Sequence, residues 1–447
     1  MNEQLYFKNG DPVTVTEHRS AHLKEHYLSL THPSGLRIYL FPKNLSTTYA
    51  LYATRFGSAD SAFTVNGEPL SLPEGCAHFL EHKMFEEADG SDAFSFFSAR
   101  GADSNAYTTW DKTAYLFSAT DHEAECLEAL IRFVSEPHFT DESVKKEQGI
   151  IAEEIRMNDD SPYDRCYQNM FRALYQSNSI RNEICGSEES IGRITPALLY
   201  RCHTLFYRPS NMVLIVAGKL SLKEVCDAVD NAYGTAKTPD PIGAVTRHDQ
   251  NGNEPKGAYL PRIEVQMQVG KPMFVIGIKD SDAVTLPASE RMKRDALMAL
   301  LKEIYFSTSS ELYNRMFDEG LISPDFSAAY GATPLYAFFE ITGESDDPDR
   351  VLAEILRELS DAKQNGIDPE AFRRARRVLY AKAVKSFDST QSVGEMLLDY
   401  VLSDYDLFRY VSLFDELTLS DAEALLRSAF SKDSFTISIV SPLDGDA

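Results

Sequence analysis

The side chains best suited to chemistry lie in the segment GCAHFLEH, residues 75–82. If this segment is helical, a turn of about 100° per residue places His82 about 40° from His78 and Glu81 about 60° to the other side. All three side chains then project from one face. Two imidazoles at this spacing can bind one Zn²⁺ at about 2.0 to 2.1 Å, and the neighbouring carboxylate can act on a water molecule at the metal.

A catalytic zinc site needs a third protein ligand, and a second predicted helix offers one. Residues 141–157 contain Glu147 and Glu154. Their separation of seven residues places both carboxylates on one helix face, about 10.5 Å apart along the axis. Because both cannot contact one ion, we expect one to be a ligand and the other to orient the ligands from outside. The alternative is an ordinary acidic helix surface, as we expect for Glu153.

A second copy of the histidine motif, HLKEH, occupies residues 22–26. It runs directly into residues 27–30 (YLSL), whose alternation of apolar and polar side chains is typical of a strand. No glutamate follows it at a suitable distance on a predicted helix. We therefore expect this copy to form a surface turn or the start of a strand rather than a metal site.

Length and composition exclude several classes of protein. The chain has 447 residues, enough for two or three domains, and its 43% hydrophobic and 25% charged residues are ordinary for a folded globular protein. Its net charge of −24 disfavours binding to nucleic acid or to an anionic membrane. We expect a cytoplasmic protein, because no segment predicts a membrane span or a signal peptide. The six cysteines show no CxxC spacing and are expected to be reduced thiols.

The chain divides at a segment rich in Pro, Gly, Asn and Asp, residues 235–257, which is predicted to link domains 1–234 and 258–447. Both domains show the same order of expected helices and strands, which predicts an internal duplication. Each copy is expected to be an α+β sandwich, a mostly antiparallel sheet with helices on one face. The expected elements are 49–56, 74–87, 92–100, 104–110, 114–119 and 121–135 in the first domain, and 262–280, 287–305, 309–319, 326–330, 335–343 and 348–363 in the second.

These motifs together resemble the pitrilysin/insulinase family of inverted zinc metallopeptidases, and its bacterial, processing-peptidase-like members above all. The resemblance covers the whole chain, through PEGCAHFLEHKMFE, GADSNAYTTWDKTAYLF, EQGIIAEEIRM and FYRPSNMVLIVAG. It implies that His78, His82 and Glu154 are ligands of Zn²⁺. It also implies that Glu81 is the general base of peptide hydrolysis and that Glu147 supports the site.

The resemblance further implies where a peptide substrate binds. Asn105 and Ala106 match an edge strand to which the substrate backbone adds as an extra strand, although a simple hairpin strand would look the same. In the second domain Arg315 matches a substrate-binding arginine, but Ile322 stands where the family has a tyrosine. Because isoleucine donates no hydrogen bond, we expect the missing donor from a partner chain. That partner would be a paralogue without the zinc motif but with an intact Arg and Tyr pair, and a homodimer is the simpler alternative.

Three functions remain open from the sequence. The first is a zinc metalloendopeptidase that hydrolyses peptides or unfolded segments enclosed in a dimeric chamber. The second is a non-catalytic scaffold or assembly subunit of the same fold, which would have no need of the HxxEH motif and the distal glutamate. The third is another metal-dependent enzyme. The acidic net charge favours cationic peptides as substrates of the first.

Overall fold

The contacts within the chain divide it into two units, each built around one large sheet. The computed structural model describes all residues except 1–4, 88–89, 91, 234–244, 248–250 and 444–447. Unit 1 consists of Met1–Ile155, Glu183–His248 and Ser386–Leu402, and unit 2 of Arg156–Asn182, Asp249–Lys385 and Ser403–Ala447. No helix in the described part of the chain combines the length and the apolar character needed to cross a bilayer.

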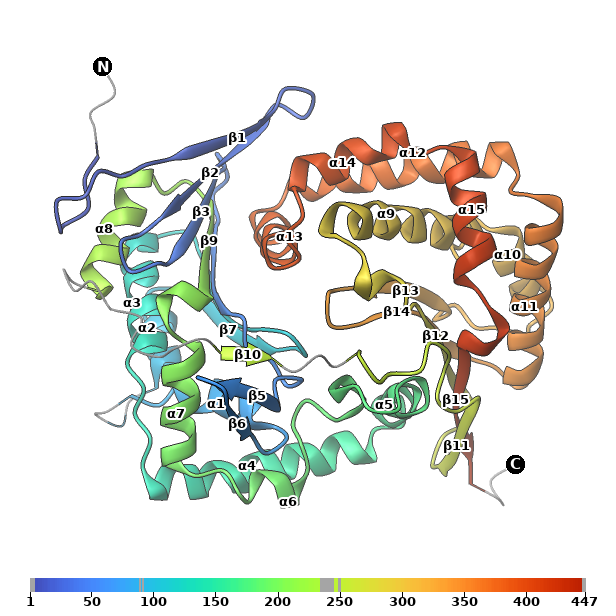
Figure 1. The fold of residues 1–447 in the computed structure, drawn as a ribbon, viewed down its shortest axis with the longest axis horizontal. Coiled ribbons are helices and arrows are strands. Elements are labelled where there is room, and N and C mark those ends of the chain that lie inside the picture. Colours follow the sequence, from blue (N-terminus) through green and yellow to red (C-terminus); the bar gives the residue numbers. More distant parts are fainter. Residues whose placement is uncertain (1–4, 88–89, 91, 234–244, 248–250, 444–447) are drawn as a thin grey trace. The chain divides into compact units, whose positions relative to one another are not determined.

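Unit 1 contains a seven-stranded sheet in the order β1-β2-β3-β9-β4-β8-β7 (Figure 1). Neighbouring strands are antiparallel except β3 and β9, which are parallel. The central strands are buried along their whole length, whereas β7 lies at the edge. The strands are β1 (Thr16–Ser20), β2 (Glu25–Thr31), β3 (Arg37–Pro42), β4 (Thr48–Thr54), β7 (Asp103–Thr108), β8 (Thr113–Ala119) and β9 (Met212–Gly218).

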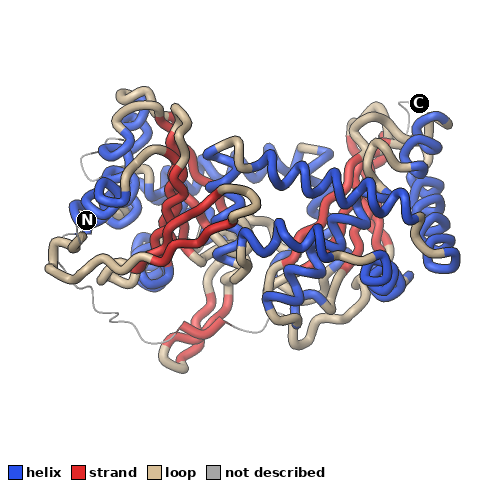
Figure 2. Tube along the Cα trace, turned by 90° about the horizontal axis from the view of Figure 1, so that it is seen from above, coloured by secondary structure: helices blue, strands red, loops and turns tan. Residues whose placement is uncertain are grey.

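Both faces of this sheet are covered. Ala50 and Tyr52 of β4 belong to the core beneath α3 and α8, while the opposite face of β4 and β9 packs against α13. A separate sheet of β10 (Val245–Arg247), β5 (Ala62–Val65) and β6 (Glu68–Ser71) completes the unit (Figure 2). The helices are α1 (Cys76–Met84), α2 (Ala93–Ser98), α3 (Glu123–Ser135), α4 (Asp141–Asp160), α6 (Glu188–Ile191), α7 (Pro196–Phe206), α8 (Leu222–Tyr233) and α13 (Thr390–Leu402).

Unit 2 repeats the plan of the larger part of that sheet. Its order, β11-β15-β12-β14-β13, has the same sequence of parallel and antiparallel pairs as β3-β9-β4-β8-β7. This agreement confirms the predicted α+β fold with an internal duplication. The elements are β11 (Arg262–Met267), β12 (Met273–Lys279), β13 (Ser327–Ala332), β14 (Ala337–Glu344), β15 (Phe435–Pro442), α5 (Pro162–Leu174), α9 (Ala288–Tyr305), α10 (Glu311–Asp318), α11 (Pro348–Asn365), α12 (Pro369–Ser386), α14 (Leu407–Glu416) and α15 (Leu419–Ala429).

The two units are not the continuous ranges 1–234 and 258–447 expected from the sequence. Helix α5 lies before the predicted linker but packs on β12 and β15 of unit 2, and its Phe171 also contacts Phe338 of β14 edge to face. Helix α13 lies after the linker but packs on β4 and β9 of unit 1. An amphipathic pattern reveals which face of a helix is buried, but it does not reveal which of two similar sheets will cover that face.

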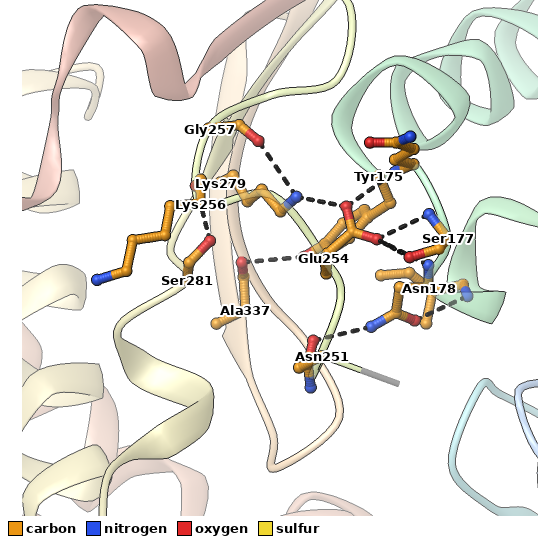
Figure 3. Close-up of polar contacts among 12 residues, drawn as sticks. Tyr175, Ser177, Asn178, Asn251, Glu254, Lys256, Gly257, Lys279, Ser281 and Ala337 are labelled. Carbon is orange, nitrogen blue, oxygen red and sulfur yellow. Dashed lines mark hydrogen bonds and ion pairs between the residues drawn. The ribbon is translucent and has the colours of Figure 1, made fainter. Parts of the chain in front are cut away.

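The described residues of the predicted linker include ordered structure. Val245–Arg247 forms β10, antiparallel to β5, while residues 234–244 and 248–250 lie outside the described part. Further along, Glu254 is anchored in unit 2 (Figure 3). Its carboxylate forms an ion pair of 2.6 Å with Lys279 and accepts hydrogen bonds from the backbone N–H groups of residues 176–178. The two side chains are only 3% and 2% exposed, so this ion pair is interior.

Replacing Glu254 with Gln is expected to lower the free energy of unfolding by about 3 to 5 kcal/mol, because Lys279 would keep a buried charge without its counter-ion. Asp282→Asn is the matched control. Asp282 pairs with Lys256 in an exposed ion pair, so its loss should cost less than about 1 kcal/mol. Urea denaturation at neutral pH measures both changes, and equal losses would contradict the prediction.

The same pair predicts a pH dependence. Burial raises the pKa of Glu254. The hydrogen bonds from Lys279 and from the N–H groups of Gln176 and Ser177 outweigh this effect and lower the pKa from 4.5 to about 2. A lowered carboxylate pKa stabilises the folded state fully above pH 4.5, and this stabilisation is lost as the pH falls toward 2. The stability difference between wild type and Glu254→Gln should therefore shrink over this range.

Candidate metal centre

Helix α1 carries the histidine motif in the geometry expected from its sequence. Phe79 and Leu80 are fully buried in the core of unit 1 and fix the helix against it. The opposite face therefore presents His78, Glu81 and His82 together. The His78 side chain is 10% exposed and that of His82 is 28% exposed, so both imidazoles are largely shielded but reachable.

Helix α4 brings Glu154 to both histidines. Its carboxylate oxygens lie 3.5 Å from Nε2 of His78 and 3.7 Å from Nε2 of His82. One donor atom from each residue lies within 4.8 Å of the others. Two nitrogen or oxygen ligands of a tetrahedral zinc ion lie about 3.3 Å apart, given metal–ligand distances of about 2.0 Å. The three side chains therefore fit a zinc ion in both donor type and spacing.

The protonation of His78 suits a metal, and a neighbouring carboxylate orients His82. Burial, together with the nearby charge of His82, lowers the pKa of His78 to about 3, so its ring is neutral. Burial opposes the positive charge of His82, but Glu147 and the other carboxylates raise its pKa overall. Nδ1 of His82 lies 3.0 Å from Oε1 of Glu147. Glu147 thus fixes the ring and leaves Nε2 for a metal, as carboxylates outside metal sites commonly do.

Thr108 holds Glu81 and was not singled out from the sequence. Its hydroxyl, at the end of β7, donates a hydrogen bond of 2.6 Å to Oε2 of Glu81. Burial raises the pKa of Glu81, while the bonds to Thr108 and the charge of His82 oppose the rise. A raised pKa suits a group that must accept and return a proton near neutral pH. The sequence offered one indication of this contact. Thr108 is a hydroxyl residue two positions after Ala106, in the strand predicted to bind substrate beside the metal centre.

The predicted substrate-binding residues of the first domain lie on the edge strand. Asn105 and Ala106 pair with Leu116 and Tyr115 of β8 on one side, and in the described part of the sheet no strand pairs with β7 on the other. The side-chain oxygen of Asn105 accepts a hydrogen bond from the N–H of Ala106. The roles of both residues remain predictions.

Arg315 lies in unit 2 and is already engaged there. Its guanidinium group lies 2.9 Å from Glu358 and 3.7 Å from Glu354 of α11. Ile322, in the position where a tyrosine was expected, is 3% exposed and packs into the interior of the unit. The metal centre belongs to unit 1, so a role for Arg315 at that centre remains a prediction.

The second histidine motif forms a hairpin. Residues 21–24 make the turn between β1 and β2, Lys24 has a positive φ of 58°, and His26 lies within β2. Among the described residues, the motif contributes to no group of metal-binding side chains. The structure thus confirms the expected turn and strand start.

Comparison with known proteins assigns the chain to a family. Residues 72–188 match the family model "Insulinase (Peptidase family M16)", and residues 193–379 match "Peptidase M16 inactive domain". The chain is 34% identical to the uncharacterized zinc protease YmfH of Bacillus subtilis over 412 residues, which is 92% of this chain and 95% of that protein. The chain belongs to peptidase family M16, the insulinase family.

Solved structures of M16 proteins share the fold. An M16-like peptidase from Alicyclobacillus acidocaldarius is 33% identical with a TM-score of 0.87, covering 97% of this chain and 99% of that one. Pitrilysin is 15% identical with a TM-score of 0.73, covering 96% of this chain but 46% of its own. The three side chains of this M16 protein that could hold a metal lie in the segment that matches the insulinase model, and Arg315 lies in the segment that matches the inactive domain.

Replacing Glu147 with Gln should weaken zinc binding by about 10- to 100-fold, because His82 would lose the carboxylate that orients its ring. Glu153→Gln is the matched control, since Glu153 is an exposed carboxylate on the same helix. Competition with a chromophoric chelator measures the dissociation constants of both variants. Equal affinities in the two variants would show that the Glu147–His82 contact has no part in metal binding.

Proposed function

We propose that this M16 family member is a zinc metalloendopeptidase that hydrolyses peptide bonds in peptides or unfolded segments. The proposal rests on the convergence of His78, His82 and Glu154. A further carboxylate, Glu81, lies on the same face of α1 as the two histidines. Two neutral imidazoles and one carboxylate are the ligands of many zinc peptidases. The relatives' name, zinc protease, supports the same reaction.

The residues of the chain divide the chemistry between them. His78, His82 and Glu154 would hold Zn²⁺, which supplies Lewis acidity toward the scissile carbonyl and lowers the pKa of water. Glu81 takes the proton of the attacking water at its carboxylate and returns it to the leaving amine. Thr108 restricts Glu81 to one orientation through its hydrogen bond to Oε2, so that Oε1 remains for the proton.

The edge strand β7 supplies a surface for the peptide backbone. A substrate that pairs with Asn105 and Ala106 as an added strand would bind through its main chain and so with little dependence on sequence. The strand is anchored to α13, because the hydroxyl of Tyr107 donates a hydrogen bond of 2.7 Å to Glu395, which also accepts one of 2.6 Å from Tyr49 of β4. A strand held in this way loses little conformational freedom when it pairs with a substrate.

We also propose that the working peptidase pairs two chains around its substrate. The chain aligns with 46% of the pitrilysin chain, so two copies match the length of that larger protein. Ile322 is apolar and buried, and it cannot donate the hydrogen bond that the family's tyrosine supplies. A paralogue that carries this tyrosine would supply the donor, whereas a homodimer of this chain, the simpler alternative, would work without it.

A scaffold function is the second candidate, because residues 193–379 match an inactive domain. Two observations favour the peptidase. Glu147 and Thr108 hold His82 and Glu81 in geometries that a non-catalytic subunit has no need to keep.

Glu81→Gln is expected to retain bound zinc and to lose at least about 1,000-fold in peptide hydrolysis, because the amide cannot accept the proton of water while the metal ligands are unchanged. Glu142→Gln, which alters an exposed carboxylate of α4, serves as control and should change neither property. Elemental analysis and a fluorogenic peptide library supply the two measurements. Full hydrolysis by Glu81→Gln would rule out the assigned mechanism, and hydrolysis by neither variant nor wild type would favour the scaffold.

The pairing predicts that activity depends on protein concentration. Dilution below the dissociation constant of the pair should lower the specific activity, and addition of a tyrosine-bearing paralogue should restore it. Sedimentation of the active preparation reports the species present. A monomer that hydrolyses peptides as fast alone as with the paralogue would contradict the proposed pairing and leave the peptidase assignment intact.

A further inference from the structure

A cysteine lies beside the metal centre without a role in the proposed mechanism. Five of the six cysteines are buried, and Cys185 is the half-buried one. It follows η1 (Ser179–Arg181) and precedes α6. Its Sγ lies 3.5 Å from Oε1 of Glu154 and 3.9 Å from Nε2 of His78. The sulfur is thus a neighbour of two of the three side chains that fit a zinc ion.

The backbone around Cys185 is locked to the start of α1. Gly75 and Gly186 have φ angles of 82° and 76°, a conformation that favours glycine. A Cβ atom at Gly75 would lie 2.3 Å from the carbonyl oxygen of Cys185, and one at Gly186 would lie 2.6 Å from the carbonyl oxygen of Glu74. The hydroxyl of Ser190 adds a hydrogen bond of 2.9 Å to the same Glu74 oxygen. The position of the thiol over His78 is therefore built into the packing of two backbone segments.

We propose that the sulfur of Cys185 is a fourth ligand of the metal held by His78, His82 and Glu154. The proposal rests on the metal centre of the proposed function. In a tetrahedral zinc site, a sulfur at about 2.3 Å and a nitrogen or oxygen at about 2.0 Å from the ion lie about 3.5 Å apart. The observed separations from Glu154 and His78, 3.5 and 3.9 Å, fit two edges of such a tetrahedron.

Coordination exchanges a proton for the metal. The S–H bond of Cys185 breaks, its proton passes to solvent, and a bond forms between sulfur and the divalent ion without any change of oxidation state. The thiolate and the carboxylate of Glu154 together balance the charge of the ion. Thiolate favours Zn²⁺, Co²⁺ and Cd²⁺ over Mn²⁺ and Mg²⁺.

The fourth ligand has a consequence for activity. A catalytic zinc ion keeps one position open for water or substrate, whereas four protein ligands close the site. The sulfur-bound form is therefore a resting state. Hydrolysis would require the sulfur to leave the metal so that water could take its place.

Cobalt substitution tests the ligand directly, independently of hydrolysis. The metal-free protein is titrated with Co²⁺, and absorption is recorded in the near ultraviolet, where cobalt–thiolate charge transfer occurs, and in the visible range. Wild type is compared with Cys185→Ser and with Cys226→Ser, which alters a buried cysteine of α8. We expect the charge-transfer band in wild type and Cys226→Ser and its loss in Cys185→Ser. The zinc dissociation constant of Cys185→Ser should rise at least about tenfold.

Each outcome either supports or contradicts the sulfur of Cys185 as a ligand. Visible cobalt bands without charge transfer in wild type would overturn the sulfur ligand and leave the metal centre and the proposed peptidase standing. Failure to bind cobalt or zinc at all would overturn both. If Cys185→Ser does not fold, X-ray absorption of the zinc-loaded wild type replaces it. A sulfur neighbour at about 2.3 Å supports the ligand, and a shell of nitrogen and oxygen alone contradicts it.

Discussion

The apposition of α1 and α4 is the constraint on which the chemistry of unit 1 depends. It gathers the carboxylates of Glu81, Glu147 and Glu154 around two imidazoles in a largely shielded space. Three carboxylates so close together repel one another, and burial adds to the cost of their charges. A divalent cation offsets this repulsion. The same crowding that disfavours three charged carboxylates without a cation would therefore favour binding of one.

The surroundings divide the carboxylates into separate roles. Glu147 contacts Nδ1 of His82, Glu154 faces the Nε2 atoms of both histidines, and Glu81 is held by Thr108. The contact with Thr108 comes from β7, and α13 holds that strand through Tyr107 and Glu395. A helix from the C-terminal part of the chain thus steadies the strand that orients a residue of the HxxEH motif.

Sequence patterns predicted the elements of this site but not all of the contacts between them. The helix expected at 74–87 is α1, and the strand pair expected at 104–110 and 114–119 is β7 and β8. These elements were predictable because hydrophobic periodicity is local. The packing of α5 and α13, the contact of Thr108 and the approach of Cys185 depend on chain segments that meet only in the folded protein. No local pattern specifies such partners.

The duplicated fold also explains how one copy can lack the metal-binding residues. Both sheets have the same order and pairing, and each is fixed by apolar side chains such as Leu214 in β9 and Ile276 in β12. Because burial of apolar surface supplies most of the stability of such a core, the fold does not need the metal to form. Histidines and carboxylates on a helix face can therefore be absent from unit 2 at little cost to its fold. In unit 1 the core around these residues keeps the three donor atoms within reach of one ion.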